Sequence, residues 1–458
     1  MPECDLLVRG ARAAGSEEPV DLAALDGEII AIGAGIDARE ARTEIDARGL
    51  FVLPGGVDPH VHFNEPGARS HWEGFASGSS ALAAGGVTTT LEMPLNASPP
   101  TTTPEAFDAK RAAAERVSRV DFGLWGGIVP GNVEQLEPLA CRGVIGFKAF
   151  MSTSGSDDFP ASDDLTLYEA MSVISGLGLL VAVHAESEEI TRGLAQRARA
   201  AGRVAIRDYL SSRPAVAETE AIASAIELAA VTGCPLHVVH VSTGRGAALV
   251  AEARARGLDV TCEVTPHHLV LTDEDTERLG VVAKCAPPLR PAGELAALWE
   301  ALARGEVSFV ASDHSPSPPE LKEGDAFAAW GGIAACQSSL ELLLTEGYGR
   351  GRLTLARVAE AFAGAAARRY RLDGKGTLEV GMDADLALVD IGPERVLERS
   401  ELRDRHRMSP YVGRTLSARV AWTILRGEPI YRVRELVGVP RGRLVGPGTQ
   451  PSRAASPR

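Results

Sequence analysis

Four histidines and one aspartate close short apolar runs of this chain, and their types and spacing are those of metal ligands. They are His60, His62, His184, His240 and Asp313. The first two are separated by one residue, so on a strand both imidazoles point to the same side. Imidazole nitrogens and carboxylate oxygens suit zinc, cobalt or manganese. Any one of these residues alone would more often be structural, but the whole set predicts a metal centre.

Lys148 is the most unusual residue of the chain because it lies inside the apolar run 143–151, which is typical of a buried strand. Lysine is also scarce here, with five lysines against 42 arginines. A buried ammonium is costly, so a lysine in a low dielectric tends to lose its proton and become a nucleophilic amine. Such an amine can add CO2 to give a carbamate, whose two oxygens can bridge two metal ions. We therefore predict two divalent ions held partly by a carboxylated Lys148.

The elements that must position these side chains are short apolar runs that alternate with alanine-rich helical stretches. Eight runs are predicted strands: 57–63, 87–93, 121–129, 144–151, 179–184, 236–241, 260–265 and 307–312. Eight strands separated by helices predict an α/β fold, a (β/α)8 barrel. Barrel enzymes carry their chemistry at the C-terminal ends of the strands, so the predicted ligands should converge on one mouth.

The ligands divide between two ions. We expect one ion on the ligands of the first and last strands, and the other on those of the fifth and sixth: His60, His62 and Asp313, then His184 and His240. The carbamate of Lys148 and a hydroxide would bridge the ions. The two ions would lower the pKa of the bound water from which this hydroxide forms. Asp313 would also be the general base and return the proton to a leaving nitrogen. His237 lies an odd number of residues from His240, so we expect it to face the opposite side, either as a packed histidine or as one that supports the ligand residues.

The two flanks of the barrel carry short hairpin-like runs, at 5–10, 28–33, 384–389 and 420–427. Neither flank is large enough for a core of its own, so we expect them to pair into one small β-sandwich. The predicted organisation is 1–52 and 373–446 as the sandwich, 53–372 as the barrel, and 447–458 as a disordered tail rich in Pro, Ser and Arg.

The composition favours a soluble cytoplasmic protein. A formal charge of −14 argues against a nucleic-acid partner and against an anionic membrane surface. The first residues lack the basic and apolar segments of a secretory signal, and no apolar run is long enough to span a bilayer. The six cysteines form no CxxC pair and are expected to be reduced.

Motifs extend from the first strand into the C-terminal flank. They are DPHVHFNEPG (58–67), HWEG (71–74), EMPLN (92–96), GFK (146–148), SDHSP (312–316), AWGGI (329–333) and SPYVGRT (409–415). Together they resemble the cyclic amidohydrolases, the family of dihydroorotases, hydantoinases and allantoinases. HWEG, MPLN and AWGG resemble the allantoinase branch. The resemblance implies the barrel-plus-sandwich fold, two metals (most often zinc) on a carboxylated lysine, opening of allantoin to allantoate in purine catabolism, and commonly a homotetramer.

Two positions depart from the family pattern. The family usually reads Glu-Pro-Gly-Arg, whereas Ala68 is inserted here before Arg69, so we assign Arg69 no role. The family often has serine before the Pro-Pro pair after the seventh strand, where this chain has Ala286. In relatives this segment and the glycine segment at Gly331 hold the ring amide through main-chain groups. We expect Ala286 and Gly331, together with Asn96, to contact a small neutral cyclic ureide.

Other reactions remain open. Dihydroorotases bind a substrate carboxylate with an arginine at the position of Asn64, so a neutral ring is favoured, either allantoin or a 5-substituted hydantoin as in hydantoinases and dihydropyrimidinases. A mononuclear deaminase would need a glutamate acid near strand 5, for which Glu186 is available; its alternative role is to support a ligand. A non-enzymatic scaffold would lack ligands, and here all are present. His267 and His268 could touch substrate or form hydrogen bonds on the barrel rim.

Overall fold

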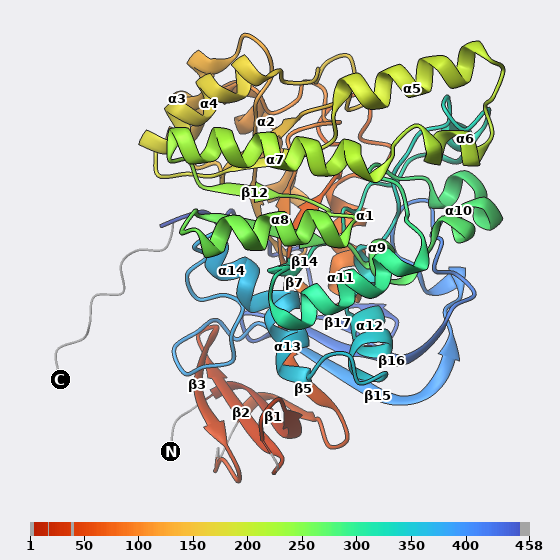
Figure 1. Ribbon diagram of the computed structural model, residues 1–458. Coiled ribbons are helices and arrows are strands. Elements are labelled where there is room, and N and C mark those ends of the chain that lie inside the picture. Colours follow the sequence, from red (N-terminus) through yellow and green to blue (C-terminus); the bar gives the residue numbers. More distant parts are fainter. Residues whose placement is uncertain (1–3, 17, 38–40, 449–458) are drawn as a thin grey trace.

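The computed structural model describes residues 4–16, 18–37 and 41–448, and its centre is a barrel of parallel strands (Figure 1). The strands are β6 (Gly56–Val61), β7 (Val87–Glu92), β8 (Asp121–Leu124) with its continuation β9 (Gly126–Gly127), β10 (Phe147–Phe150), β11 (Val181–His184), β12 (Leu236–Val238), β13 (Val260–Val264) and β14 (Phe309–Val310). A bridge between Val61 and His314 joins the last strand region to the first. Each predicted strand is found, and the (β/α)8 fold is confirmed.

Helices connect the strands and cover the barrel. They are α1 (Phe75–Ala84), α2 (Pro104–Val117), α3 (Leu136–Cys141), α4 (Asp164–Gly176), α5 (Glu188–Ala200), α6 (Ile206–Ser211), α7 (Ala215–Thr232), α8 (Gly244–Ala255), α9 (Pro266–Val270), α10 (Asp273–Leu279), α11 (Ala292–Arg304), α12 (Ser339–Leu342), α13 (Leu355–Ala359) and α14 (Ala365–Arg369). Local sequence sets their ends: the Thr103 side chain accepts from Ala106 N at the start of α2, and left-handed Gly233 ends α7. Within the described ranges, no helix is long and apolar enough to cross a membrane.

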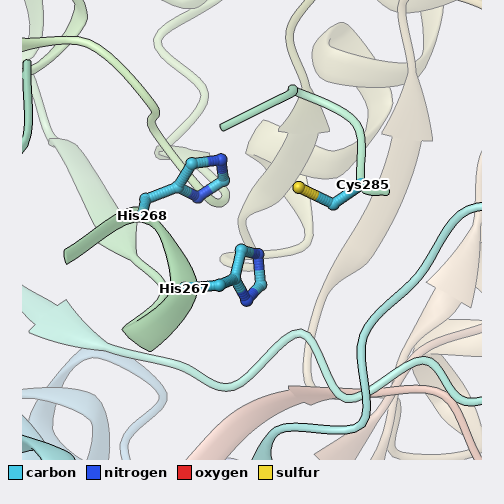
Figure 2. A group of neighbouring side chains, drawn as sticks. All are labelled: His267, His268 and Cys285. Carbon is cyan, nitrogen blue, oxygen red and sulfur yellow. The ribbon is translucent and has the colours of Figure 1, made fainter. Parts of the chain in front are cut away.

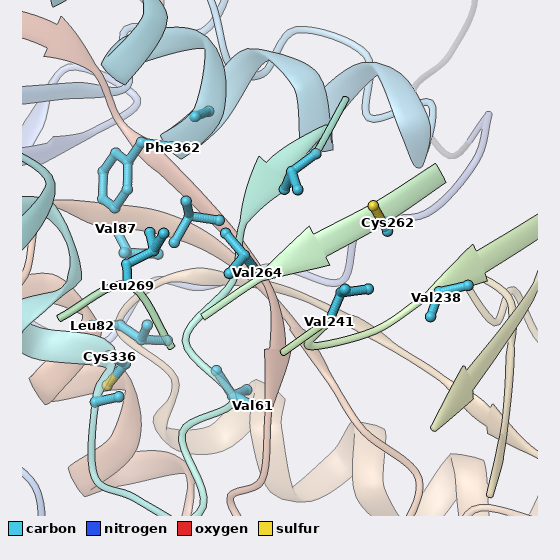
Figure 3. Packing of buried hydrophobic residues seen from close by; sticks show 14 of the residues in the cluster. Val61, Leu82, Val87, Val238, Val241, Cys262, Val264, Leu269, Cys336 and Phe362 are labelled. Carbon is cyan, nitrogen blue, oxygen red and sulfur yellow. The ribbon is translucent and has the colours of Figure 1, made fainter. Parts of the chain in front are cut away.

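Strand alternation sorts side chains between the barrel interior and the helices. On β13, Cys262 and Val264 belong to the cluster that packs against the helices, while Glu263 points to the interior. Figure 3 shows part of this cluster, with Val238 and Cys262 on adjacent strands. Burying one such side chain contributes about 1.5–3 kcal/mol. The same alternation on β10 places Lys148 in the interior, because its neighbours face the helices.

Most of the predicted strands end one to three residues earlier than the sequence predicts, among them the two that lead to His240 and Asp313. β12 ends at Val238 and β14 at Val310, because the chain turns at His240 and Asp313, whose φ angles are 37° and 45°. Left-handed backbone is uncommon for residues other than glycine and costs about 1–3 kcal/mol. The predicted orientation of His237 is therefore wrong. The turn breaks the alternation, and His237 faces the interior, with Nε2 3.1 Å from Glu263 Oε2.

The two flanks form one mostly antiparallel sheet of nine strands. They are β1 (Cys4–Ala13), β2 (Val20–Leu25), β3 (Glu28–Gly33), β4 (Ala41–Asp46), β5 (Phe51–Pro54), β15 (Leu386–Val396), β16 (Thr415–Leu425), β17 (Glu428–Arg432) and β18 (Glu435–Leu436). β5 pairs with β15, so the ends of the chain share a sheet, seen as red and blue strands at the bottom of Figure 1. Lys375 ties it to the barrel through Asp121 (2.7 Å) and Asp385 (2.8 Å). Most of the predicted tail, 449–458, lies outside the described residues.

Candidate metal centre and pocket

The six predicted ligand residues lie at the C-terminal mouth of the barrel. Five of them line one cavity: His60, His62, His184, His240 and Asp313. The sixth, Lys148, interacts electrostatically with His62, His184 and His240, and so with members of both predicted groups. All six side chains are at least largely buried, from 0% exposure for Lys148 to 13% for Asp313. The structure therefore brings together residues that are up to 253 positions apart in the sequence (Asp313 minus His60).

The first ligand group consists of His60, His62 and Asp313. The Nε2 atom of each histidine lies 3.3 Å from Asp313 Oδ1. Burial alone would raise the pKa of Asp313, but His60 and His62 outweigh it and hold that pKa below its usual range. Burial also lowers the pKa of His62 to about 4. An ionised carboxylate beside a neutral imidazole is the protonation state that can bind a cation.

The second group is the pair His184 and His240. His184 Nδ1 lies 3.0 Å from His240 Nε2. Burial lowers the pKa of both imidazoles, and nearby positive charge lowers that of His240 further. One proton at most can lie between two neutral imidazole nitrogens. When neither nitrogen carries a proton, both lone pairs are free for one cation.

Lys148 has the environment of a reactive amine. Its Nζ is fully buried, has no hydrogen-bond partner in the described part of the chain, and lies 4.6 Å from the centre of the Phe150 ring. Burial lowers the pKa of Lys148 to about 7, although Glu263 and Asp313 oppose the shift. A neutral amine is the form that adds CO2, so the site fits carboxylation of this lysine.

Two buried glutamates contact the outer nitrogens of two predicted ligands, His60 and His184. Glu263 Oε1 lies 2.5 Å from His60 Nδ1, and Glu186 Oε2 lies 2.9 Å from His184 Nε2. A carboxylate on one ring nitrogen fixes the tautomer and leaves the other nitrogen for a metal. Sequence analysis missed Glu263. The available signal was a single acidic residue inside the apolar run 260–265.

Glu186 is not free to serve as the acid of a deaminase. Arg213 donates to both of its oxygens at 2.7–3.1 Å. Burial would raise the pKa of Glu186, but Arg213 and His184 outweigh burial and hold it below its usual range. A carboxyl that stays ionised cannot donate a proton near neutral pH. The structure favours the other role weighed for Glu186, orientation of His184.

Comparisons with known proteins agree with this geometry. The sequence profile of the Amidohydrolase family matches residues 51–430. The chain belongs to the amidohydrolase family. It is 58% identical over 450 residues to an allantoinase of Rubrobacter xylanophilus (98% of each chain), and 52% identical to an allantoinase of Solibacter usitatus (98% of this chain, 97% of the relative). The solved L-hydantoinase (dihydropyrimidinase) from Arthrobacter aurescens is similar with a TM-score of 0.93 at 36% identity, covering 97% of this chain and 100% of that one. Family and donor set together imply a binuclear metal centre.

The amidohydrolase pocket continues from the ligands to two main-chain segments, 284–286 and 329–332. Asn96, Ala286 and Gly331, which we expected to contact substrate, all line it. Asn96 is 4% exposed, and its Oδ1 has no protein partner among the described residues. Gly332 has φ +110°, and a Cβ there would lie 2.3 Å from Ser315 O, so this position requires glycine.

Two buried lysines hold these segments together. Lys284 Nζ donates to Ala329 O, and Gly332 N donates to Lys284 O at 2.8 Å. Lys322 Nζ donates to Trp330 O at 3.0 Å and to Gly332 O at 2.7 Å. Burial lowers the pKa of Lys284 to about 8 and that of Lys322 to about 7, so at neutral pH Lys284 is mostly charged and Lys322 is charged in part. These bonds turn the carbonyls of 329–332 toward the ammonium groups and so fix which main-chain atoms face the cavity.

Three positively charged side chains line the cavity, and two of them already donate hydrogen bonds to protein groups. Arg199, Arg213 and Lys284 line it. Arg213 donates to Glu186 and Lys284 to Ala329 O, which leaves the exposed Arg199 at the edge. Arg69, to which we assigned no role, pairs with Asp158 at 3.0 Å. Because Arg213 is bound to Glu186, it is not free to bind a substrate carboxylate.

Proposed function

We propose that this amidohydrolase is an allantoinase, which hydrolyses the ring amide of allantoin to give allantoate. The observation that carries the proposal is the contact of Asp313 Oδ1 with both His60 and His62 at 3.3 Å, beside a buried Lys148 whose Nζ has no hydrogen-bond partner among the described residues. The curated relatives at 58% and 52% identity support allantoin as the substrate. We place the reaction in purine catabolism.

The residues present fit two divalent ions, for which we propose zinc, with cobalt and manganese as alternatives. His60, His62 and Asp313 would hold one ion, and His184 and His240 the other. Lys148 would reach both after its neutral amine adds CO2, with a new bond between Nζ and the carbon and loss of one proton from nitrogen. The buried, unpartnered Nζ supports this assignment. When bound, the ions would polarise the ring carbonyl and lower the pKa of the attacking water.

Asp313 is the group proposed to move the proton. His60 and His62 keep its carboxylate ionised, so Asp313 can accept a proton from the attacking water. As the ring C–N bond breaks, the same proton passes from Asp313 to the departing nitrogen. The carbonyl carbon keeps the new oxygen, and the resulting carboxylic acid releases its remaining proton to solvent to give the carboxylate of allantoate.

Main-chain groups near Ala286 and Gly331, with the Asn96 side chain, are proposed to bind the ureide ring. Such groups suit a ring with amide donors and acceptors, and a neutral ring needs no charged clamp. The second candidate is a 5-substituted hydantoin, which the similarity to the Arthrobacter aurescens hydantoinase favours. Ring-opening assays of allantoin and 5-substituted hydantoins, side by side on the metal-loaded enzyme, decide between them. Faster turnover of a hydantoin would replace allantoin as the substrate.

A cytoplasmic location and a homotetramer, both suggested by the sequence, stay proposals. The absence of a membrane-crossing helix in the described ranges is compatible with the first. Sedimentation analysis of the purified protein tests the second.

A further inference from the structure

Three further side chains with metal-binding atoms lie together beside the pocket, apart from the six predicted ligands. They are His267, His268 and Cys285 (Figure 2). We propose that they form an additional site for a soft divalent cation such as Cd²⁺, Hg²⁺ or excess Zn²⁺, and that a cation bound there inhibits the enzyme. The inhibition rests on the proposed function, whereas the binding does not.

The three side chains are close enough to share one ion. Their ligand atoms all lie within 4.8 Å of one another, and each residue is at most 3% exposed. Figure 2 shows the Cys285 sulfur pointing toward the two imidazole rings. His267 and His268 stand in α9, directly after β13, where the Thr265 side chain caps the helix. A thiolate with two imidazoles is a donor set that soft and borderline cations prefer.

The imidazole ring of His267 is the feature that distinguishes this site from a cysteine that is only packed in the core. Neither of its ring nitrogens has a hydrogen-bond partner among the described residues, although the side chain is 1% exposed. A buried polar group without a partner costs about 1–3 kcal/mol. An imidazole nitrogen that carries no proton offers a lone pair. A cation would satisfy it.

Cys285 and His268 would change partners when the ion binds. At present Cys285 Sγ donates to Pro287 O at 3.2 Å, and His268 Nε2 lies 3.1 Å from the same oxygen. On binding, the S–H bond breaks, the sulfur bonds to the cation, and the proton passes to solvent. His268 completes the set once it releases Pro287 O. Burial, and then the negative charge of Asp313, raises the pKa of the Cys285 thiol, so the sulfur loses its proton only as the cation binds.

An ion can reach this site from solvent, and an ion bound there would disturb the wall proposed to bind substrate. Cys285 lines the main cavity, so an ion can reach the sulfur through the pocket. The next residue is Ala286, part of the wall proposed to bind substrate. The Cys285 carbonyl is held by Tyr209 Oη at 2.9 Å, so a shift of the sulfur moves a fixed segment of this wall. Inhibition would follow from this shift.

Cadmium binding to the zinc-loaded enzyme tests the site. Because Cys141 is exposed, the background is the Cys141→Ser variant, which removes an unrelated thiol. We expect one added Cd²⁺ per chain with zinc retained, a thiolate-to-cadmium absorption band, and loss of activity. Cys285→Ser on this background should abolish the added cadmium, the absorption band and the loss of activity, with zinc still retained. Cys234→Ser is the matched control, since Cys234 is also buried and donates to a proline carbonyl, Pro235 O at 3.6 Å. It should bind cadmium like the background.

A second variant keeps the thiol and removes the imidazole. His267→Gln should weaken cadmium binding at least tenfold, with zinc content and circular dichroism unchanged. Unchanged cadmium stoichiometry in Cys285→Ser, unchanged affinity in His267→Gln, or exchange of cadmium for zinc with no added ion would each overturn the site. Bound cadmium with full activity would overturn the inhibition. An enzyme inactive on allantoin before cadmium is added contradicts the proposed function instead, and cadmium binding still decides the site.

Discussion

His184 Nδ1 and His240 Nε2 lie 3.0 Å apart, although 56 residues separate them in the chain. Their strands are neighbours: Val183 pairs with Val238, which places His184 level with Val239 and one residue short of His240. The left-handed backbone of His240 closes that gap by turning its ring into the barrel mouth. The second ligand group therefore depends on a strained residue just beyond the end of β12.

The first prediction concerns Lys148→Ala. If the amine carries CO2 between two ions, this variant should lose most of its bound metal and nearly all activity, while short carboxylic acids added with metal should restore part of both. Metal analysis and turnover give the measurement. Lys110→Ala removes a buried ammonium that pairs with Glu92, so it should lower stability but keep the metal. Full metal content and a normal rate in Lys148→Ala would end the carbamate proposal.

A second prediction follows from the pKa of Lys148, which burial lowers to about 7. Only the neutral amine adds CO2, and its fraction rises as the pH increases through 7. At a fixed concentration of dissolved CO2, metal-free enzyme should therefore be reconstituted roughly tenfold faster at pH 8 than at pH 6. Recovery of activity after addition of metal and CO2 measures this rate. A rate independent of pH would show that the amine is already neutral, or that it is not the acceptor.

The third prediction is that Asp313→Asn lowers kcat on the order of 10²–10⁴-fold, the usual size of an acid–base contribution. The thermal midpoint should barely change, because the side chain lies at the barrel mouth. Pre-steady-state and steady-state rates over a pH range provide the test. Retained activity with the original pH profile would assign the proton to another group.

Much of this architecture could be predicted from the sequence because the signals are local. Apolar runs at regular intervals gave the eight strands, and polar residues at their ends indicated the ligands. The scarcity of lysine was also informative, since all five lysines are at most 8% exposed. Glu263 escaped notice because an isolated acid in a strand has no local pattern. The orientation of His237 was predicted wrongly because the backbone of His240 is set by tertiary contacts, which sequence periodicity does not record.

The pocket wall could not be predicted for a similar reason. Lys284 and Lys322 reach residues that are 45 and 8–10 positions away, and nothing in their flanking sequence shows which carbonyls they meet.

The fourth prediction concerns this pocket wall. Lys322→Met keeps the volume but removes the bonds to Trp330 O and Gly332 O, so KM for allantoin should rise roughly tenfold, equivalent to about 1.4 kcal/mol. The value of kcat and the metal content should stay the same. A change in kcat alone, with KM unaffected, would contradict a role in substrate binding.

The central claim is that the pocket selects a neutral ureide ring, and the ratio of kcat/KM for allantoin to that for dihydroorotate tests it most directly. Asn64 stands where a carboxylate clamp would need an arginine, and Arg213 is already bound to Glu186. The carboxylate of dihydroorotate would therefore be left unpaired, and the expected ratio is roughly 10⁴ or greater in favour of allantoin. Comparable values for the two substrates would contradict the account and make dihydroorotate the substrate to consider first.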